Sequence, residues 1–182
     1  MNAPAAPDRS LPALPQLTLD QFMAQALAME REAVERYTEF ADMLESANNL
    51  EVAVLFRTMA GYEAKHAQQI MAEMGWTQAP PPPQLPPGSP GTDAPEVMPH
   101  DEAHYLMQPW HALQMALAAE RKAEAFFALL ARMATTEPVR RAALELQAEE
   151  AGHVELVQEW LRKVPKPDQD WAVDPDPPRY VD

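Results

Sequence analysis

The stretch Glu63-Ala64-Lys65-His66 recurs, with the same polar ends, as Glu150-Ala151-Gly152-His153. Residues three apart lie on the same face of an α-helix, so each glutamate shares a face with its histidine. Apolar residues recur at helical spacing on either side of both stretches, and each polar pair falls inside the apolar stripe. Both stretches are therefore predicted to present a carboxylate and an imidazole to the protein core.

The repetition extends to the segments upstream of these pairs. Residues 26–37, ALAMEREAVERY, align with residues 116–127, ALAAERKAEAFF, with six identities in twelve positions. Glu30 aligns with Glu120, and each precedes its E-x-x-H pair, by 33 and 30 residues respectively. The first of these segments has a predicted inward stripe that surrounds Glu30 and consists of Phe22, Ala26, Ala33, Val34, Tyr37, Ala41 and Leu44. The chain is thus predicted to contain two copies of one helical hairpin.

Prolines mark the boundaries of the predicted helices. Eighteen of the 20 prolines lie in residues 4–15, 80–99 and 165–178, and Pro109 and Pro138 stand at predicted helix starts, where proline is tolerated. Thr18 and Gln21 form a capping-box pattern, Asn48-Asn49 predicts a turn, and Gly75 predicts a helix end. Helices are expected at about residues 18–45, 50–74, 109–133 and 137–163.

The expected organisation places one bundle between two proline-rich ends. It comprises a flexible Pro/Ala-rich arm (1–17), hairpin 18–76, a Pro-rich linker (77–108), hairpin 109–163 and an acidic Pro-rich tail (164–182). Extended proline-rich chain rises roughly 3.1 Å per residue, so the linker can travel the length of a helix. Its length predicts that the third helix runs parallel to the second. The fold class is therefore all-α, a ferritin-like four-helix bundle of two repeated hairpins joined by a long crossover.

The composition excludes several kinds of function. A formal net charge of −14 argues against nucleic acid or an anionic membrane as partner. The absence of cysteine excludes disulfides, thiolate metal sites and a cysteine nucleophile. The first residues have no apolar run of signal-peptide length, and no later run is long enough to span a bilayer. A cytoplasmic location is the expectation.

Four glutamates and two histidines on core faces form a metal-ligand set of the kind found in di-iron carboxylate bundles. A single histidine on a helix is usually a packed or surface residue, and a single inward glutamate often reflects a misjudged register. Two E-x-x-H pairs in matching repeat positions, each with a matching upstream glutamate, are far more specific. The predicted metal ligands are Glu30, Glu63, His66, Glu120, Glu150 and His153.

Other polar residues have less specific readings. His100, His104 and His111 are expected to be incidental. Glu124 and Glu149 either support the ligands or are exposed acids. Gly61 and Gly152 lie within two residues of predicted ligands, so either close packing and access to the metals or simple tolerance of glycine accounts for them.

Residues 18–163 resemble the rubrerythrin branch of the ferritin-like superfamily, through Glu30 with Tyr37, Glu63-x-x-His66, Glu120 and Glu150-x-x-His153. The resemblance implies two iron ions, with manganese as the alternative metal. It implies that Glu63 and Glu150 bridge the ions, that Glu30 and Glu120 are terminal ligands, and that each histidine binds one ion. It also implies a catalytic role for Tyr37 through a hydrogen bond near the site.

Two departures from rubrerythrins bear on the activity. Ala123 stands where rubrerythrins usually carry a seventh carboxylate, three residues after the third-helix glutamate. The chain also has no cysteine-ligated rubredoxin domain. An external electron donor is therefore expected. The six-ligand set is closer to that of bacterioferritins and di-iron oxidases.

The expected function is a di-iron oxidoreductase that reacts with hydrogen peroxide or dioxygen, as a peroxidase or ferroxidase. The alternatives are a di-iron oxygenase that acts on an organic substrate, a protein that stores or delivers iron, and a helical adaptor whose PPPPQLPP segment binds an SH3-like partner. A linker that spans the bundle explains those prolines more simply than the adaptor does. Pairing of hairpins between chains, in a homodimer, is compatible with the long linker.

Overall fold

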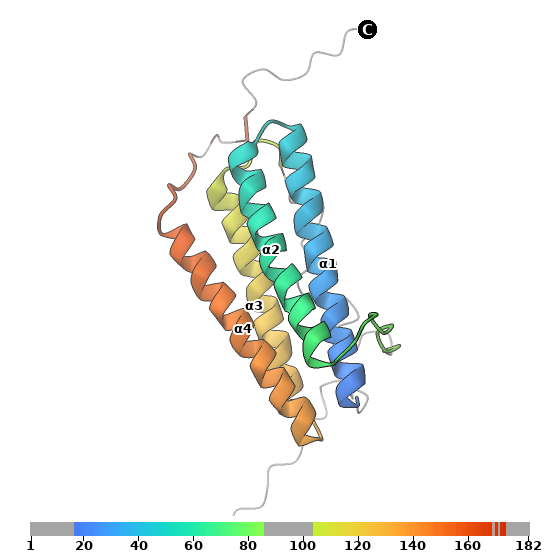
Figure 1. The fold of residues 1–182 in the computed structure, drawn as a ribbon. Coiled ribbons are helices and arrows are strands. Elements are labelled where there is room, and N and C mark those ends of the chain that lie inside the picture. The colour runs from blue at the N-terminus through green and yellow to red at the C-terminus, as the bar shows by residue number, and fades with distance from the viewer. Residues whose placement is uncertain (1–16, 86–103, 169, 171, 174–182) are drawn as a thin grey trace, which may run out of the picture.

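Four long helices account for most of the chain. In the computed structural model, residues 17–85, 104–168, 170 and 172–173 are described. They form α1 (Leu19–Ser46), α2 (Leu50–Glu73), α3 (Pro109–Met133) and α4 (Glu137–Leu161). Figure 1 shows α1 antiparallel to α2 and α3 antiparallel to α4, which confirms the predicted bundle of two hairpins. Within the described part of the chain, no helix is both long and apolar enough to cross a membrane.

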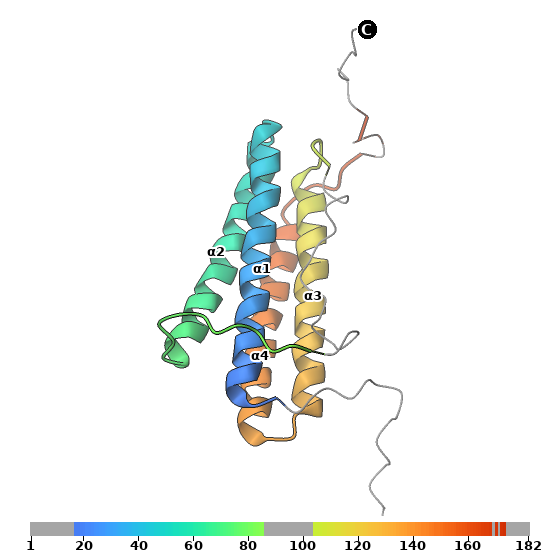
Figure 2. The ribbon, with the colours of Figure 1, turned by 90° about the vertical axis from the view of Figure 1, so that its right-hand side faces the viewer.

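The connection between the hairpins determines how they are oriented. Helices α2 and α3 run in the same direction, as the predicted long crossover requires (Figure 1). The start of the linker leaves the end of α2 and crosses α1 toward α3 (Figure 2). There Leu85 lines a small cavity with Phe22 of α1 and Phe127 of α3. The predicted arm up to residue 16, linker residues 86–103 and tail residues 169, 171 and 174–182 lie outside the described residues.

The first hairpin begins and ends with the predicted signals. At the start of α1, the Gln21 N–H donates to Thr18 Oγ1 (3.2 Å) and the Thr18 N–H donates to Gln21 Oε1 (3.0 Å). Gly75, just past α2, has a φ of 65°, which glycine adopts without steric cost. The next N–H, of Trp76, donates to the Met71 carbonyl (2.9 Å) and closes the helix end. Local sequence therefore determines where the first hairpin begins and where it ends.

Two apolar clusters fill the core, one toward each end of the bundle. One includes Leu44 and Val52, beside the α1–α2 turn, and the other includes Leu130 and Val139, beside the α3–α4 turn. On every helix, the predicted ligand glutamate falls in sequence between the residues of one cluster and those of the other. The four glutamates therefore occupy a polar layer between two apolar ones.

One residue of the predicted inward stripe faces differently. Val34 is half-buried and lines a surface groove between α1 and α2, together with Ala64 and Met71. The prediction that Val34 faces inward was wrong, because Ala33 and Tyr37 already fill the inward face of that turn.

Candidate metal centre

The polar layer at mid-height consists of carboxylates and imidazoles from all four helices. The exposed fraction is 1% for Glu30 on α1, 2% for Glu63 on α2, 2% for Glu120 on α3 and 1% for Glu150 on α4. His153 is 8% exposed. Glutamate is almost never fully buried unless it is paired or binds a metal, because an ionised carboxylate loses its hydration in the core. Burying four of them in one layer therefore needs a compensating positive charge.

The structure brings all six predicted ligands together. Their ligand atoms form three overlapping groups, and within each group all atoms lie within 4.8 Å of one another. Each group contains both carboxylate oxygen and imidazole nitrogen. Glu30 and Glu120 each belong to one group, and the other four residues, Glu63, His66, Glu150 and His153, each belong to two. The arrangement is consistent with a site for two metal ions. The role of each individual ligand stays a prediction.

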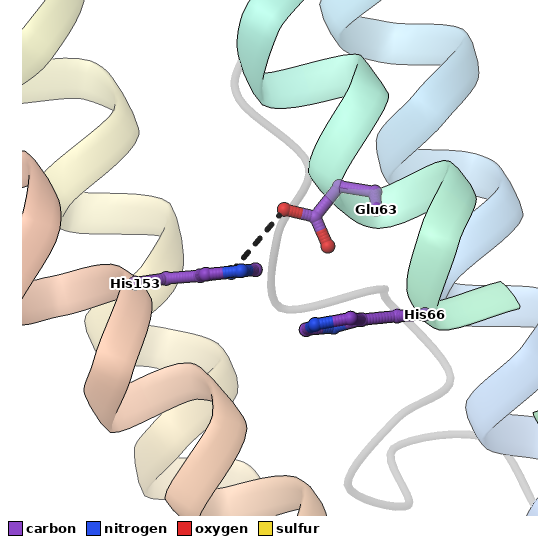
Figure 3. A group of neighbouring side chains, drawn as sticks. All are labelled: Glu63, His66 and His153. Carbon is purple, nitrogen blue, oxygen red and sulfur yellow. Dashed lines mark ion pairs between the residues drawn. The ribbon is translucent and has the colours of Figure 1, made fainter. Parts of the chain in front are cut away.

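His153 lies among carboxylates from both hairpins. Its Nδ1 is 3.2 Å from Glu120 Oε2, 3.5 Å from Glu63 Oε1 and 3.8 Å from Glu150 Oε2. Its ring stacks on that of His66, with centroids 4.7 Å apart and planes 7° from parallel. Figure 3 shows the two rings approaching from α4 and α2, with the Glu63 carboxylate beside them. The two E-x-x-H pairs thus face each other across the bundle.

His66 is suited to act as a neutral nitrogen donor. Its Nδ1 is buried, makes no hydrogen bond to the described residues, and lies 3.9 Å from Glu30 Oε2. Burial lowers the pKa of His66 from 6.5 to about 4, and the charge of the neighbouring His153 acts in the same direction. At neutral pH the ring is therefore uncharged and has a lone pair for a cation.

Tyr37 connects the two hairpins at the polar layer. Its hydroxyl donates a hydrogen bond of 2.8 Å to Glu120 Oε1, and the side chain is 1% exposed. Its ring stacks on Phe56 at a centroid distance of 6.0 Å, which restricts its orientation. Tyr37 therefore holds the Glu120 carboxylate in place and carries a proton directly beside the cluster.

The donor set fits two divalent metal ions. Carboxylate oxygen and imidazole nitrogen are ligands that suit iron and manganese. Four ionised glutamates carry four negative charges, which two divalent ions would neutralise inside the low-dielectric core. Without cations, four ionised carboxylates in one layer would repel one another. Two sets of residues would hold the ions. One set is Glu30, Glu63, His66 and Glu150, and the other is Glu120, Glu150 and His153.

Residues adjacent to the cluster were not resolved by sequence reasoning. Glu149 is half-buried, and its Oε2 lies 3.9 Å from His66 Nδ1. Burial raises its pKa, partly offset by a hydrogen bond from Gln69. Tyr62, which the sequence analysis passed over, has its ring centroid 5.7 Å from that of His153. When the two E-x-x-H pairs are aligned in sequence, Tyr62 corresponds to Glu149, and this alignment could have indicated that both residues lie beside the cluster.

The two helical glycines near the cluster serve no close packing. Gly61 and Gly152 are exposed, and a Cβ built on either would meet no atom within 4 Å. Of the two readings given above, simple tolerance of glycine fits these positions, since both face away from the polar layer.

Comparisons with known proteins agree with this geometry. A family model described as Rubrerythrin matches residues 21–79, which contain the first hairpin with Glu30, Tyr37, Glu63 and His66. A crystal structure of an uncharacterised conserved protein from Magnetospirillum magnetotacticum MS-1 is 34% identical in sequence and has a TM-score of 0.60. The match covers 84% of this chain and 99% of the other. No curated protein matches the chain.

Proposed function

Because this chain belongs to the rubrerythrin family, we propose that it is a non-haem di-iron oxidoreductase that reacts with hydrogen peroxide or dioxygen. The observation that carries this proposal is the buried layer of four glutamates and two histidines contributed by all four helices. A layer of this composition is costly in a protein core unless cations occupy it. Manganese is the alternative metal.

The glutamates and histidines of the polar layer would hold two ferrous ions, which would supply the two electrons that, with two protons, reduce one molecule of hydrogen peroxide to two of water. The protein positions and shields the reacting groups. The apolar clusters above and below the polar layer cover it from both ends of the bundle. Tyr37 orients Glu120 by donating its hydroxyl proton in a hydrogen bond to that carboxylate, with the two oxygens 2.8 Å apart. An external electron donor would then return the ions to the ferrous state, since the chain carries no cysteine for a rubredoxin-type centre.

The test is an anaerobic ferrous titration followed by separate rapid mixing with hydrogen peroxide and with dioxygen, observed by near-ultraviolet absorbance. We expect two irons per chain and faster oxidation by peroxide. The Glu63→Ala, His66→Ala variant is expected to lose stoichiometric binding. A Glu51→Ala, His104→Ala variant removes the same residue types outside the polar layer and is the matched control.

The outcomes separate the candidate activities. Faster oxidation by dioxygen would favour a ferroxidase, or an oxygenase whose substrate would then be screened. Iron retained in quantities far above two per chain in a closed multi-subunit shell would favour storage. Absence of stoichiometric binding, or a Glu63→Ala, His66→Ala variant that behaves like the parent, would contradict the proposal.

A further inference from the structure

The two histidines of the polar layer have different neighbours on their outer sides. Superposing one E-x-x-H pair on the other in sequence shifts α2 onto α4, so that Tyr62 corresponds to Glu149 and Glu73 corresponds to Trp160. Tyr62, beside His153, therefore corresponds to Glu149, beside His66. Trp160, which lies against Tyr62, corresponds to Glu73, which Gln69 joins to Glu149. The repeat conserves the ligand positions while the two surrounding surfaces differ in kind.

The surface beside His153, which we call the aromatic flank, consists of Tyr62 and Trp160. The Tyr62 ring lies 5.7 Å from the His153 ring and 6.5 Å from the Trp160 ring, measured between centroids. The Lys65 ammonium lies 5.3 Å from the centroid of the Tyr62 ring. The contacts described on this side are between aromatic rings and a positive charge, which attract a hydrated cation less than carboxylates do.

The surface beside His66, which we call the acidic flank, consists of Glu149, Glu73 and Gln69. Gln69 Nε2 donates to Glu149 Oε1 and to Glu73 Oε1, at 3.0 Å in each case, and so holds the two carboxylates together. The Glu149 side chain is 29% exposed, which leaves it in contact with solvent. Its Oε2 is 3.9 Å from His66 Nδ1, the same distance that separates this nitrogen from Glu30 Oε2.

We propose that Glu149 is the carboxylate through which divalent cations reach the polar layer. A cation bound by Glu149 at the surface is already beside His66 Nδ1, and exchanging Glu149 for Glu30 would complete the transfer inward. Glu149 does not belong to the groups of ligand atoms at the core of the site, so we place it outside the permanent ligand set. A local cluster of negative charge raises the concentration and the association rate of cations. The inference rests on the proposed di-metal site.

The experiment measures uptake of cobalt(II) without oxygen or peroxide, by stopped-flow visible absorbance, on the full chain. Glu149→Gln is expected to take up cobalt about tenfold more slowly and to reach the same final stoichiometry as the parent. Glu149→Asp is expected to recover part of the rate. Glu155→Gln makes the same charge change at an exposed position of α4 and is expected to leave the rate unchanged.

Three results would overturn the proposal. The first is an uptake rate of Glu149→Gln equal to that of the parent. The second is an equal slowing in Glu155→Gln, which would reduce the effect to general attraction by net charge. The third is loss of one cobalt ion at equilibrium in Glu149→Gln, which would make Glu149 a permanent ligand.

Two measurements on the parent chain, cobalt uptake and the reaction after iron loading, distinguish this inference from the proposed function. A parent chain that loads cobalt normally but does not react with peroxide or dioxygen after iron loading would contradict only the proposed function. A parent chain that takes up no metal would contradict the site, and with it both proposals.

Discussion

The α1–α2 and α3–α4 hairpins carry the same ligand pattern, yet they place different residues beside it. Tyr37 of the first hairpin donates a hydrogen bond to Glu120, whereas the corresponding Phe127 of the second has no hydroxyl and packs edge-on against Phe22 at 6.5 Å. Tyr62 corresponds to Glu149 in the same way. The repeat thus maintains the six predicted ligand positions, and different residues lie beside them in the two hairpins.

The comparison also shows that neither hairpin makes the site alone. His153 of the second hairpin lies 3.5 Å from Glu63 of the first, and Tyr37 of the first bonds Glu120 of the second. The polar layer forms only when the hairpins dock. Three predictions test how the two hairpins depend on each other and differ from each other, from the largest expected effect to the smallest.

Metal binding should stabilise both hairpins through one shared site. With free ferrous ion at about 1,000 times its Kd, one site adds about 4 kcal/mol to the unfolding free energy. That corresponds to a rise in Tm of about 8 to 16 °C for a domain of this size. Anaerobic calorimetry should show the rise in the parent but in neither the Glu63→Ala, His66→Ala variant nor the Glu150→Ala, His153→Ala variant. A full rise in either one would mean that a single hairpin suffices.

The hydrogen bond between the hairpins should contribute measurably to stability. Tyr37→Phe leaves Glu120 without its buried donor and should lower the unfolding free energy by about 1 to 3 kcal/mol. Urea denaturation of the metal-free chain measures this change. Tyr62→Phe removes a hydroxyl from a half-exposed tyrosine, and its effect should stay within about 0.5 kcal/mol. Equal effects of the two substitutions would show that the Tyr37 hydroxyl contributes no more to stability than the Tyr62 hydroxyl does.

The turns of the two hairpins should respond differently to alanine. Among the described residues other than glycine, Asn48 alone has a positive φ, of 58°. Asn48→Ala should therefore cost about 1 kcal/mol, because the short polar side chain of asparagine favours the left-handed conformation through local hydrogen bonds that alanine cannot make. Asn48→Gly should be tolerated, and Thr135→Ala in the other turn should stay within about 0.5 kcal/mol. Urea midpoints would report these differences, and a costly Asn48→Gly would contradict the backbone explanation.

Much of this structure follows from local sequence signals. The Thr18 capping box, Gly75 and Pro109 determine where helices begin and end, because they act on backbone groups within a few residues. The capping box of α3, in which the Gln108 N–H donates to His111 Nδ1 (3.1 Å), was not anticipated, since neither residue is a common cap. His111 thus has a local structural role outside the polar layer.

The buried glutamates were predictable for the same local reason. Helical periodicity assigned Glu30, Glu63, Glu120 and Glu150 to inward faces, and the internal repeat made the assignment specific. Val34 shows where periodicity fails, because it lies at the edge of the stripe, where the neighbouring helix decides which side chain is covered. Glu149 shows the same limit, because the sequence left open whether it is exposed or supports a ligand.

The sequence by itself determined the helices, the two-hairpin repeat, the parallel course of α2 and α3, and the donor types in the core. These properties depend on residue spacing and chain length, which can be read directly. Only the tertiary structure decided that Tyr37 bonds Glu120, 83 residues away, and that His66 has an acidic flank while His153 has an aromatic one. Those contacts join residues remote in the chain, and their distances depend on how α1 packs against α3 and α2 against α4.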